Sequence, residues 1–252
     1  MPWTTNAATD IGDREEQQDR YLIVKHDKKD MLLLAVADGA GGHLSGAKAA
    51  EAAIRCIHQN IPLLWQSPDP SVFLNDLLVE CNQRVLAVEG DDLTCTTLVL
   101  AFVKNDEIFW AHTGDSRLYL IRNQSVAIRT IDHTVKELQK EQDLEVSSSN
   151  AGKLYMCLGA VPQITPEVGG SVLRDGDCFL LCSDGLWGQM DLEQRINCLD
   201  YKQISPERLA DWVYEAKTNG SGSSDNITAV TATYQCAPSI WHRFITLFER
   251  WF

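Results

Sequence analysis

The sequence lacks any apolar run that approaches the ~20 residues of a membrane-spanning helix. It also lacks a basic N-terminal segment followed by an apolar stretch, so it gives no sign of a secretory signal peptide. Basic residues are in the minority, since 22 Lys and Arg face 35 Asp and Glu and leave a net charge of −13. This excess of negative charge disfavours nucleic acids and anionic membrane surfaces as partners.

Paired cysteine motifs are missing too. The 8 cysteines are scattered, mostly inside apolar segments, and none belongs to a CxxC pair. We interpret them all as reduced thiols, which predicts a reducing, cytoplasmic location. No Cys/His cluster has the spacing of zinc ligands, and no GxxxxGK loop is present to bind a nucleotide.

The apolar segments that are present predict a layered α+β sandwich, with sheets inside and helices outside. The turns Asn105-Asp106 and Gly114-Asp115-Ser116 predict a meander of antiparallel hairpins between strands. No repeat or long linker divides the chain, so residues 1–237 are predicted to form one domain. The expected strands are 21–26, 31–37, 94–103, 107–114, 117–122, 172–184 and 226–234, and the expected helices are 45–60, 69–89, 132–145 and 205–218.

The C-terminal segment 238–252 has a different character. Its Ile, Trp and Phe side chains recur at helical spacing, which predicts an amphipathic helix. Three interpretations stay open: a helix docked on the domain, an exposed patch for a partner protein, and a membrane-surface anchor. The shortness of the helix and the acidity of the chain disfavour the last of these.

Two apolar runs end in Asp-Gly, at Asp38-Gly39 and Asp184-Gly185. Each predicts a buried strand that ends in a tight turn, and ordinary loop chemistry would explain either pair taken alone. Three further aspartates stand beside predicted strands, namely Asp19, Asp115 and Asp225. All five could therefore point to one edge of the sandwich.

Clustered carboxylates require compensating cations, and Mg²⁺ or Mn²⁺ with oxygen ligands would supply them. Two such ions acidify a bridging water to hydroxide, which can attack a phosphorus atom in line. Arg14 offers a bidentate fork for the substrate phosphate, although a surface salt bridge with Glu15 or Glu16 is the alternative. His112 and His133 are interpreted as structural rather than catalytic.

With these residues in view, the chain resembles the metal-dependent serine/threonine protein phosphatases of type 2C in their compact bacterial form. The resemblance covers most of the chain before residue 237 and is carried by an ordered set of motifs. These are GDREEQQD (12–19), VADGAGGHLSG (36–46), CTTLVLAFV (95–103), AHTGDSRLYLIR (111–122), DHT (132–134), LGA (158–160), LLCSDGLWG (180–188) and SDNITAVTA (224–232).

The resemblance implies a four-layer α-β-β-α sandwich with two mainly antiparallel sheets, and two or three Mn²⁺ or Mg²⁺ ions. It implies that the enzyme hydrolyses phosphoserine and phosphothreonine in proteins and opposes a Ser/Thr kinase. The implied roles are these: Asp38 bridges two metals, the Gly39 carbonyl binds the first, Asp184 and Asp225 bind the second, Asp19 contacts the cluster through water, Asp115 joins Asp184 at a third metal, Arg14 holds the substrate phosphate, and Asn226 orders the loop of Asp225.

Three departures from the family pattern accompany the resemblance. Gln17-Gln18 precede Asp19 where the family has Asn and then Glu or Gln. Ala40 stands where many eukaryotic members have a histidine as general acid, so the leaving group must be protonated from elsewhere, and His43 is assigned to the turn. The flap at about 135–157 is shorter than in many bacterial members, which predicts a different substrate preference.

Two other functions remain open at this stage. One is a binding module that uses a phosphatase-like scaffold without turnover. The other is a metal-dependent hydrolase of small phosphate esters.

Overall fold

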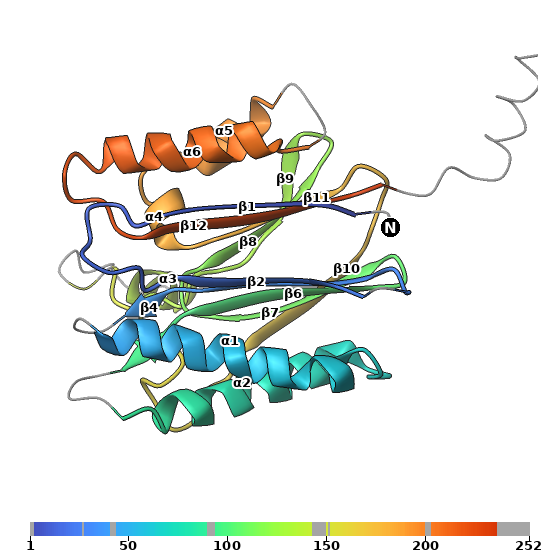
Figure 1. Cartoon of the computed structure of the whole chain (residues 1–252), viewed down its shortest axis with the longest axis horizontal. Helices are drawn as coiled ribbons and strands as arrows, with labels where there is room; N and C mark the ends of the chain where they lie inside the picture. Colours follow the sequence, from blue (N-terminus) through green and yellow to red (C-terminus); the bar gives the residue numbers. More distant parts are fainter. Residues whose placement is uncertain are drawn as a thin grey trace, which may run out of the picture.

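The computed structural model describes residues 3–26, 28–40, 44–89, 94–142, 150, 152–199 and 203–235. The predicted C-terminal helix and His43 lie outside the described residues. In Figure 1, two β-sheets lie between two layers of helices. The predicted α+β sandwich of four layers is therefore confirmed, and the strand pairs of both sheets are all antiparallel.

The first sheet has helices α5 (Leu192–Asn197) and α6 (Pro206–Asn219) on its outer face, and the short helix α4 (Asp184–Trp187) at its edge (Figure 1). Its strands, in spatial order, are β1 (Trp3–Asp10), β12 (Ile227–Tyr234), β11 (Cys178–Cys182), β8 (Arg117–Arg122) and β9 (Ser125–Arg129).

The second sheet is covered by the long helices α1 (Leu44–Leu64) and α2 (Pro70–Leu86) (Figure 1). Its strands, in spatial order, are β10 (Glu167–Val172), β7 (Glu107–Thr113), β6 (Leu98–Lys104), β3 (Met31–Ala37) and β2 (Arg20–Lys25). The two-residue strands β4 (Gly39–Ala40) and β5 (Cys95–Thr96) pair with each other, and helix α3 (Val135–Glu141) follows β9.

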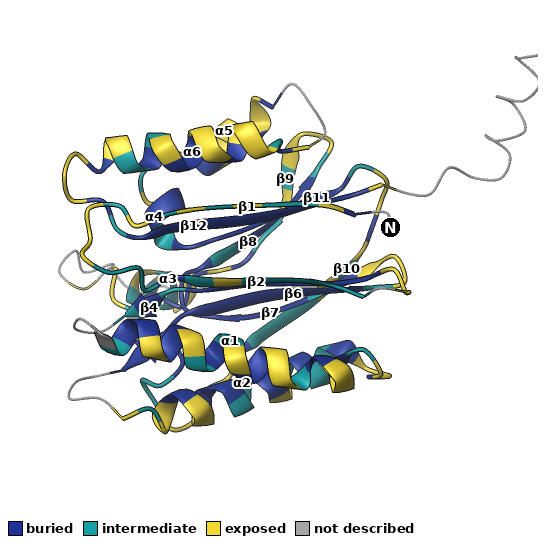
Figure 2. Ribbon diagram, viewed as in Figure 1, coloured by how far each residue is buried: buried dark blue, intermediate teal, exposed yellow. Residues whose placement is uncertain are grey.

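Central strands are buried on both faces because each sheet has a neighbour on either side (Figure 2). In β3, Leu33 and Ala35 pack toward α1 and α2, while Leu32 and Leu34 pack into the core between the sheets. A third core lies between the first sheet and α5 and α6. This explains why the run at 31–37 is apolar at every position instead of alternating.

One predicted hairpin is wrong. Strands β7 and β8 do not pair, because Gly114-Asp115-Ser116 carries the chain from the second sheet to the first. Two short strands joined by a turn-like tripeptide give the same sequence signal whether they pair or diverge. The outcome matters for function, because Asp115 lies in this crossover between the sheets.

Helix α1 continues past its predicted end at residue 60 and contains Pro62. Proline has no N–H to donate to the helix. The loss is tolerated here because the helix ends two residues later, and the Trp65 N–H still donates to Ile61 O at 3.0 Å. Strands β1, β9 and β10 and helices α4 and α5 were not predicted as separate elements. Much of β1, β9 and β10 is half-exposed or exposed, which weakens the apolar signal in their sequences.

No helix in the described parts of the chain has both the length and the apolar character needed to cross a membrane.

Candidate active site

The structure brings the five predicted aspartates to one edge of the sandwich, the edge that carries β4 and α4 (Figure 1). Asp19 precedes β2, Asp38 lies between β3 and β4, and Asp115 lies in the crossover. Asp184 is the first residue of α4, and Asp225 precedes β12. Each carboxylate is thus fixed by a strand or helix end.

A cavity of about 320 Å³ opens at this edge. Arg14 is the only basic residue among the described residues that line it. The lining comprises Arg14, Gln18, Asp38, Gly39, Ala40, Thr97, Asp115, Gly152, Leu154, Asp184 and Asp225. Asp19 lies behind this lining and is 3% exposed.

Burial and mutual repulsion raise the pKa values of four of the carboxyl groups. Burial is the larger cause at each of them, and it raises the pKa of Asp19 and of Asp115 to about 7. The pKa of Asp38 is raised by burial and then by the charges of the other four aspartates. Burial and Asp225 raise the pKa of Asp184, while a hydrogen bond with Asp38 and the charge of Arg14 act in the opposite direction.

These features fit hard divalent cations. Asp19 Oδ2 accepts a hydrogen bond of 2.8 Å from Ser183 Oγ, whereas its buried Oδ1 has no partner among the described residues. An unpartnered buried carboxylate oxygen is costly unless a cation compensates it. The cavity supplies oxygen ligands only, which is the donor set that Mg²⁺ and Mn²⁺ prefer.

The two Asp-Gly pairs are not the tight turns that the sequence predicted. Neither glycine has a positive φ, because Gly39 belongs to β4 and Gly185 to the first turn of α4. Each is needed because another backbone comes very close. A Cβ on Gly39 would lie 2.2 Å from Gly46 O, and a Cβ on Gly185 would lie 2.1 Å from Asn226 O.

Asn226 fastens the loop of Arg14 to the start of β12. Its Oδ1 accepts a 2.7 Å hydrogen bond from Gln18 N–H. Its Nδ2 donates to Ile11 O at 2.8 Å and to Glu16 O at 3.0 Å. The sequence predicted only that Asn226 orders the loop of Asp225, whereas the structure shows that it also holds the loop of Arg14. Gln17, one of the departures from the family pattern, accepts a 2.9 Å hydrogen bond from Asp19 N–H.

Arg14 forms an ion pair, but not with Glu15 or Glu16. Its Nη2 lies 2.7 Å from Asp225 Oδ2, and the Arg14 side chain remains 58% exposed. The guanidinium therefore stands at the mouth of the cavity with further N–H groups available for an anion.

Sequence reasoning missed the residues that hold Asp38. Thr96 Oγ1 donates to Asp38 O at 2.9 Å, and Asp38 N–H donates to Thr97 Oγ1 at 3.1 Å. The tandem threonines at the start of an apolar strand were the available signal, since a hydroxyl at a buried position needs a partner. Gly152 and Leu154 bring the predicted flap to the cavity wall.

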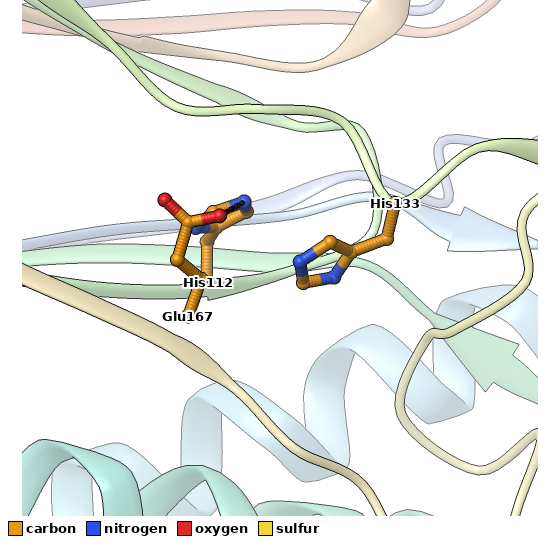
Figure 3. A group of neighbouring side chains, drawn as sticks. All are labelled: His112, His133 and Glu167. Atoms are coloured by element: carbon orange, nitrogen blue, oxygen red, sulfur yellow. Dashed lines mark ion pairs between the residues drawn. The ribbon is translucent and has the colours of Figure 1, made fainter. Parts of the chain in front are cut away.

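A second group of metal-ligand side chains, His112, His133 and Glu167, lies beside the crossover (Figure 3). The two imidazoles stack at a centroid distance of 4.7 Å and an interplanar angle of 21°. His112 Nε2–H donates to Ile131 O at 2.8 Å, and His133 Nδ1 accepts from Gly114 N–H at 3.2 Å. Stacked rings direct their in-plane lone pairs along separate planes, so this arrangement favours a structural role over a shared ion.

The comparisons with known proteins agree with this geometry. The family model for protein phosphatase 2C matches residues 8–214. The chain belongs to the protein phosphatase 2C family. It is a metal-dependent protein phosphatase, as predicted, and Mn²⁺ or Mg²⁺ is its cofactor.

Among its relatives is the serine/threonine phosphatase Stp of Listeria monocytogenes, 28% identical over 221 residues that cover 82% of this chain and 86% of the relative. A solved serine/threonine phosphatase of S. agalactiae has the same fold, with a TM-score of 0.77 at 23% identity over 92% of this chain and 99% of the other. The catalytic domain of PstP, solved with two manganese ions, has a TM-score of 0.73 at 25% identity over 92% and 98%.

Proposed function

We propose that this protein phosphatase removes phosphate from phosphoserine and phosphothreonine at the cavity described above, with residues 1–237 as its catalytic domain. The observation that carries the proposal is a single cavity of about 320 Å³ lined by four of the aspartates and Arg14, with the fifth, Asp19, buried beside them. Relatives that bear the name serine/threonine phosphatase support the substrate class.

In this proposal Asp38 would be shared by two ions, the Gly39 carbonyl would help to hold the first ion, and Asp184 and Asp225 would hold the second. Asp19 would support the cluster through water, and Asp115 would join Asp184 at a third ion. The ions would supply an acidified water and a neutralising charge for the phosphate. The unpartnered Asp19 Oδ1 and the raised pKa values of Asp38 and Asp184 support this set of ligands.

In this proposal the chain's own side chains orient the phosphate and shape the cavity around it. Arg14 would be released from Asp225 to bind the substrate phosphate if Asp225 held an ion, because a carboxylate bound to a cation attracts a guanidinium less strongly. Ala40 offers no proton, and no histidine is among the described residues that line the cavity. Gly152 and Leu154 would contact the peptide beside the phosphate and influence substrate choice.

We place the reaction in the cytoplasm, opposite a Ser/Thr kinase, and we assign the C-terminal segment 238–252 to docking on the domain or to a partner protein. The 7 described cysteines are all free thiols, which supports a reducing compartment.

The test is a Mn²⁺-dependent assay on phosphoserine and phosphothreonine peptides and on an aryl phosphate. We expect hydrolysis that Asp38→Ala and excess chelator abolish, and rates on peptides that exceed those on small esters. Full activity of Asp38→Ala would contradict the site assignment. Stoichiometric phosphopeptide binding without turnover would contradict the assigned activity.

A further inference from the structure

The crossover that carries Asp115 is held at each of its three residues. Gly114 exchanges two hydrogen bonds with His133, 3.2 Å from its N–H to Nδ1 and 2.9 Å from His133 N–H to its carbonyl. Ser116 Oγ lies 2.7 Å from Thr97 Oγ1. The carbonyl of Asp115 itself accepts a 3.0 Å hydrogen bond from the indole N–H of Trp187.

Trp187 stands on α4, the helix that begins with Asp184. One short helix therefore carries a proposed metal ligand at its start and, at its end, a donor to the backbone of another. Among the described residues, no other hydrogen bond joins α4 to the crossover 114–116. The β8–β11 strand pair brings the two segments together as far as Arg117 and Cys182, two residues from each aspartate. The Trp187 contact extends this link beyond the strand ends to Asp115 itself.

The indole cannot easily swing away from Asp115. The guanidinium carbon of Arg117 lies 3.5 Å from the centroid of the Trp187 ring. Arg117 in turn makes two hydrogen bonds to Asp132, of 2.8 and 2.6 Å, and its side chain is only 14% exposed. A bidentate pair of this kind holds the Arg117 guanidinium in one orientation. The cation–π contact with the guanidinium then restrains the Trp187 ring.

We propose that Trp187 is a positioning residue, which sets the separation of Asp115 and Asp184 and thereby the affinity for the ion that the two carboxylates share. The inference rests on the ligand assignment under Proposed function. Beyond the paired ends of β8 and β11, the two repelling carboxylates are free to move apart unless a further contact holds them. A ligand set that is correctly spaced in advance binds its ion more tightly.

The decisive variant is Trp187→Phe, which removes the N–H and keeps an aromatic ring beside Arg117. Trp3→Phe is the matched control, because the buried indole N–H of Trp3 has no partner among the described residues and lies in another part of the molecule. We expect Trp187→Phe to weaken the step of Mn²⁺ binding that involves Asp115 about 2- to 10-fold in calorimetry, the range for one lost hydrogen bond. Trp3→Phe should bind Mn²⁺ like the parent protein.

A double-mutant cycle separates positioning from a general effect on structure. Asp115→Ala should weaken the same step, and adding Trp187→Phe to Asp115→Ala should change it no further. Additive losses, or unchanged Mn²⁺ binding by Trp187→Phe, would overturn the proposal. Absence of Mn²⁺ binding by the parent protein would overturn the ligand assignment and this inference with it, whereas absence of phosphatase turnover alone would leave the calorimetric comparison decisive.

Discussion

At the scale of single residues, the described lining of the cavity contains one basic side chain, Arg14, and four aspartates. Arg14 lies at the cavity mouth and pairs with Asp225, so in the proposed site it would connect a metal ligand to the phosphate of the substrate. An exposed ion pair contributes little to stability, because water and salt screen it. Its value here is therefore in binding rather than in folding.

Replacing Arg14 with alanine should raise KM for phosphopeptides by about 10- to 100-fold, because a hydrogen bond to a charged group is worth about 1.5–3 kcal/mol. The measurement is steady-state kinetics at saturating Mn²⁺. Arg55→Ala is the matched control, since Arg55 pairs with Glu51 at the same 2.7 Å and is similarly exposed, at 68%. An equal KM for the two variants would contradict phosphate binding by Arg14.

At the scale of elements, the crossover between β7 and β8 depends on neutral histidines. Burial and the neighbouring His112 lower the pKa of His133 to about 3 from an ordinary value of 6.5. Burial also lowers the pKa of His112, against opposing effects of Ile131 O, Glu167 and Asp132. Protonation of the unfolded chain below pH 6.5 therefore competes with folding, so this contribution to stability is lost progressively as the pH falls toward 3.

His133→Asn should make the stability less sensitive to acid, because its amide cannot take up a proton. The free energy of unfolding of the parent protein should fall relative to that of the variant between about pH 6.5 and 4, by up to about 1.4 kcal/mol per pH unit. Denaturant titration at several pH values in chelator measures this difference. Parallel pH profiles would show that His133 takes up its proton equally in the folded and unfolded protein, which would contradict the lowered pKa.

Sequence reasoning was most successful where a residue pattern has one structural meaning. The apolar run at 31–37 is β3 as predicted, and the helix predicted at 69–89 is α2, which spans Pro70–Leu86. Reasoning failed where the meaning depends on a distant segment. The tripeptide 114–116 forms a crossover because β8 pairs with β11, and Gly39 and Gly185 are required by backbone neighbours that only the fold supplies.

The five aspartates follow the same distinction. Their placement beside strands was visible in the sequence, and the structure brings them to one edge. Their supports were not visible, because Thr97, Trp187 and Ser183 act through hydrogen bonds to residues far away in the chain.

At the scale of the whole molecule, a chain of net charge −13 concentrates buried carboxylates at one edge. Each raised pKa is a destabilising contribution, because ionising the group costs more in the folded protein than in the unfolded chain. In chelator this penalty is absent below about pH 4 and grows as the pH rises through about 7.

Asp38→Asn should therefore be more stable than the parent protein at pH 8 in chelator, because it removes one buried charge. With Mn²⁺ the order should reverse, since ion binding stabilises the parent by about 2.7 kcal/mol at a free concentration of 100 times Kd. Thermal unfolding with and without Mn²⁺ measures both effects. A variant that is less stable in chelator would contradict the repulsion, and an equal Mn²⁺ response would contradict the role of Asp38 as a ligand.

The arrangement of the two sheets has a further consequence. Asp184 and Asp225 adjoin strands of one sheet, while Asp19 and Asp38 adjoin strands of the other. Apolar packing fills the core between the sheets, and directional contacts such as the Ser183–Asp19 hydrogen bond join the sheets at this edge. If the proposed ligands hold ions from both sides, metal binding would add a further link between the two sheets and would couple metal loading to their alignment.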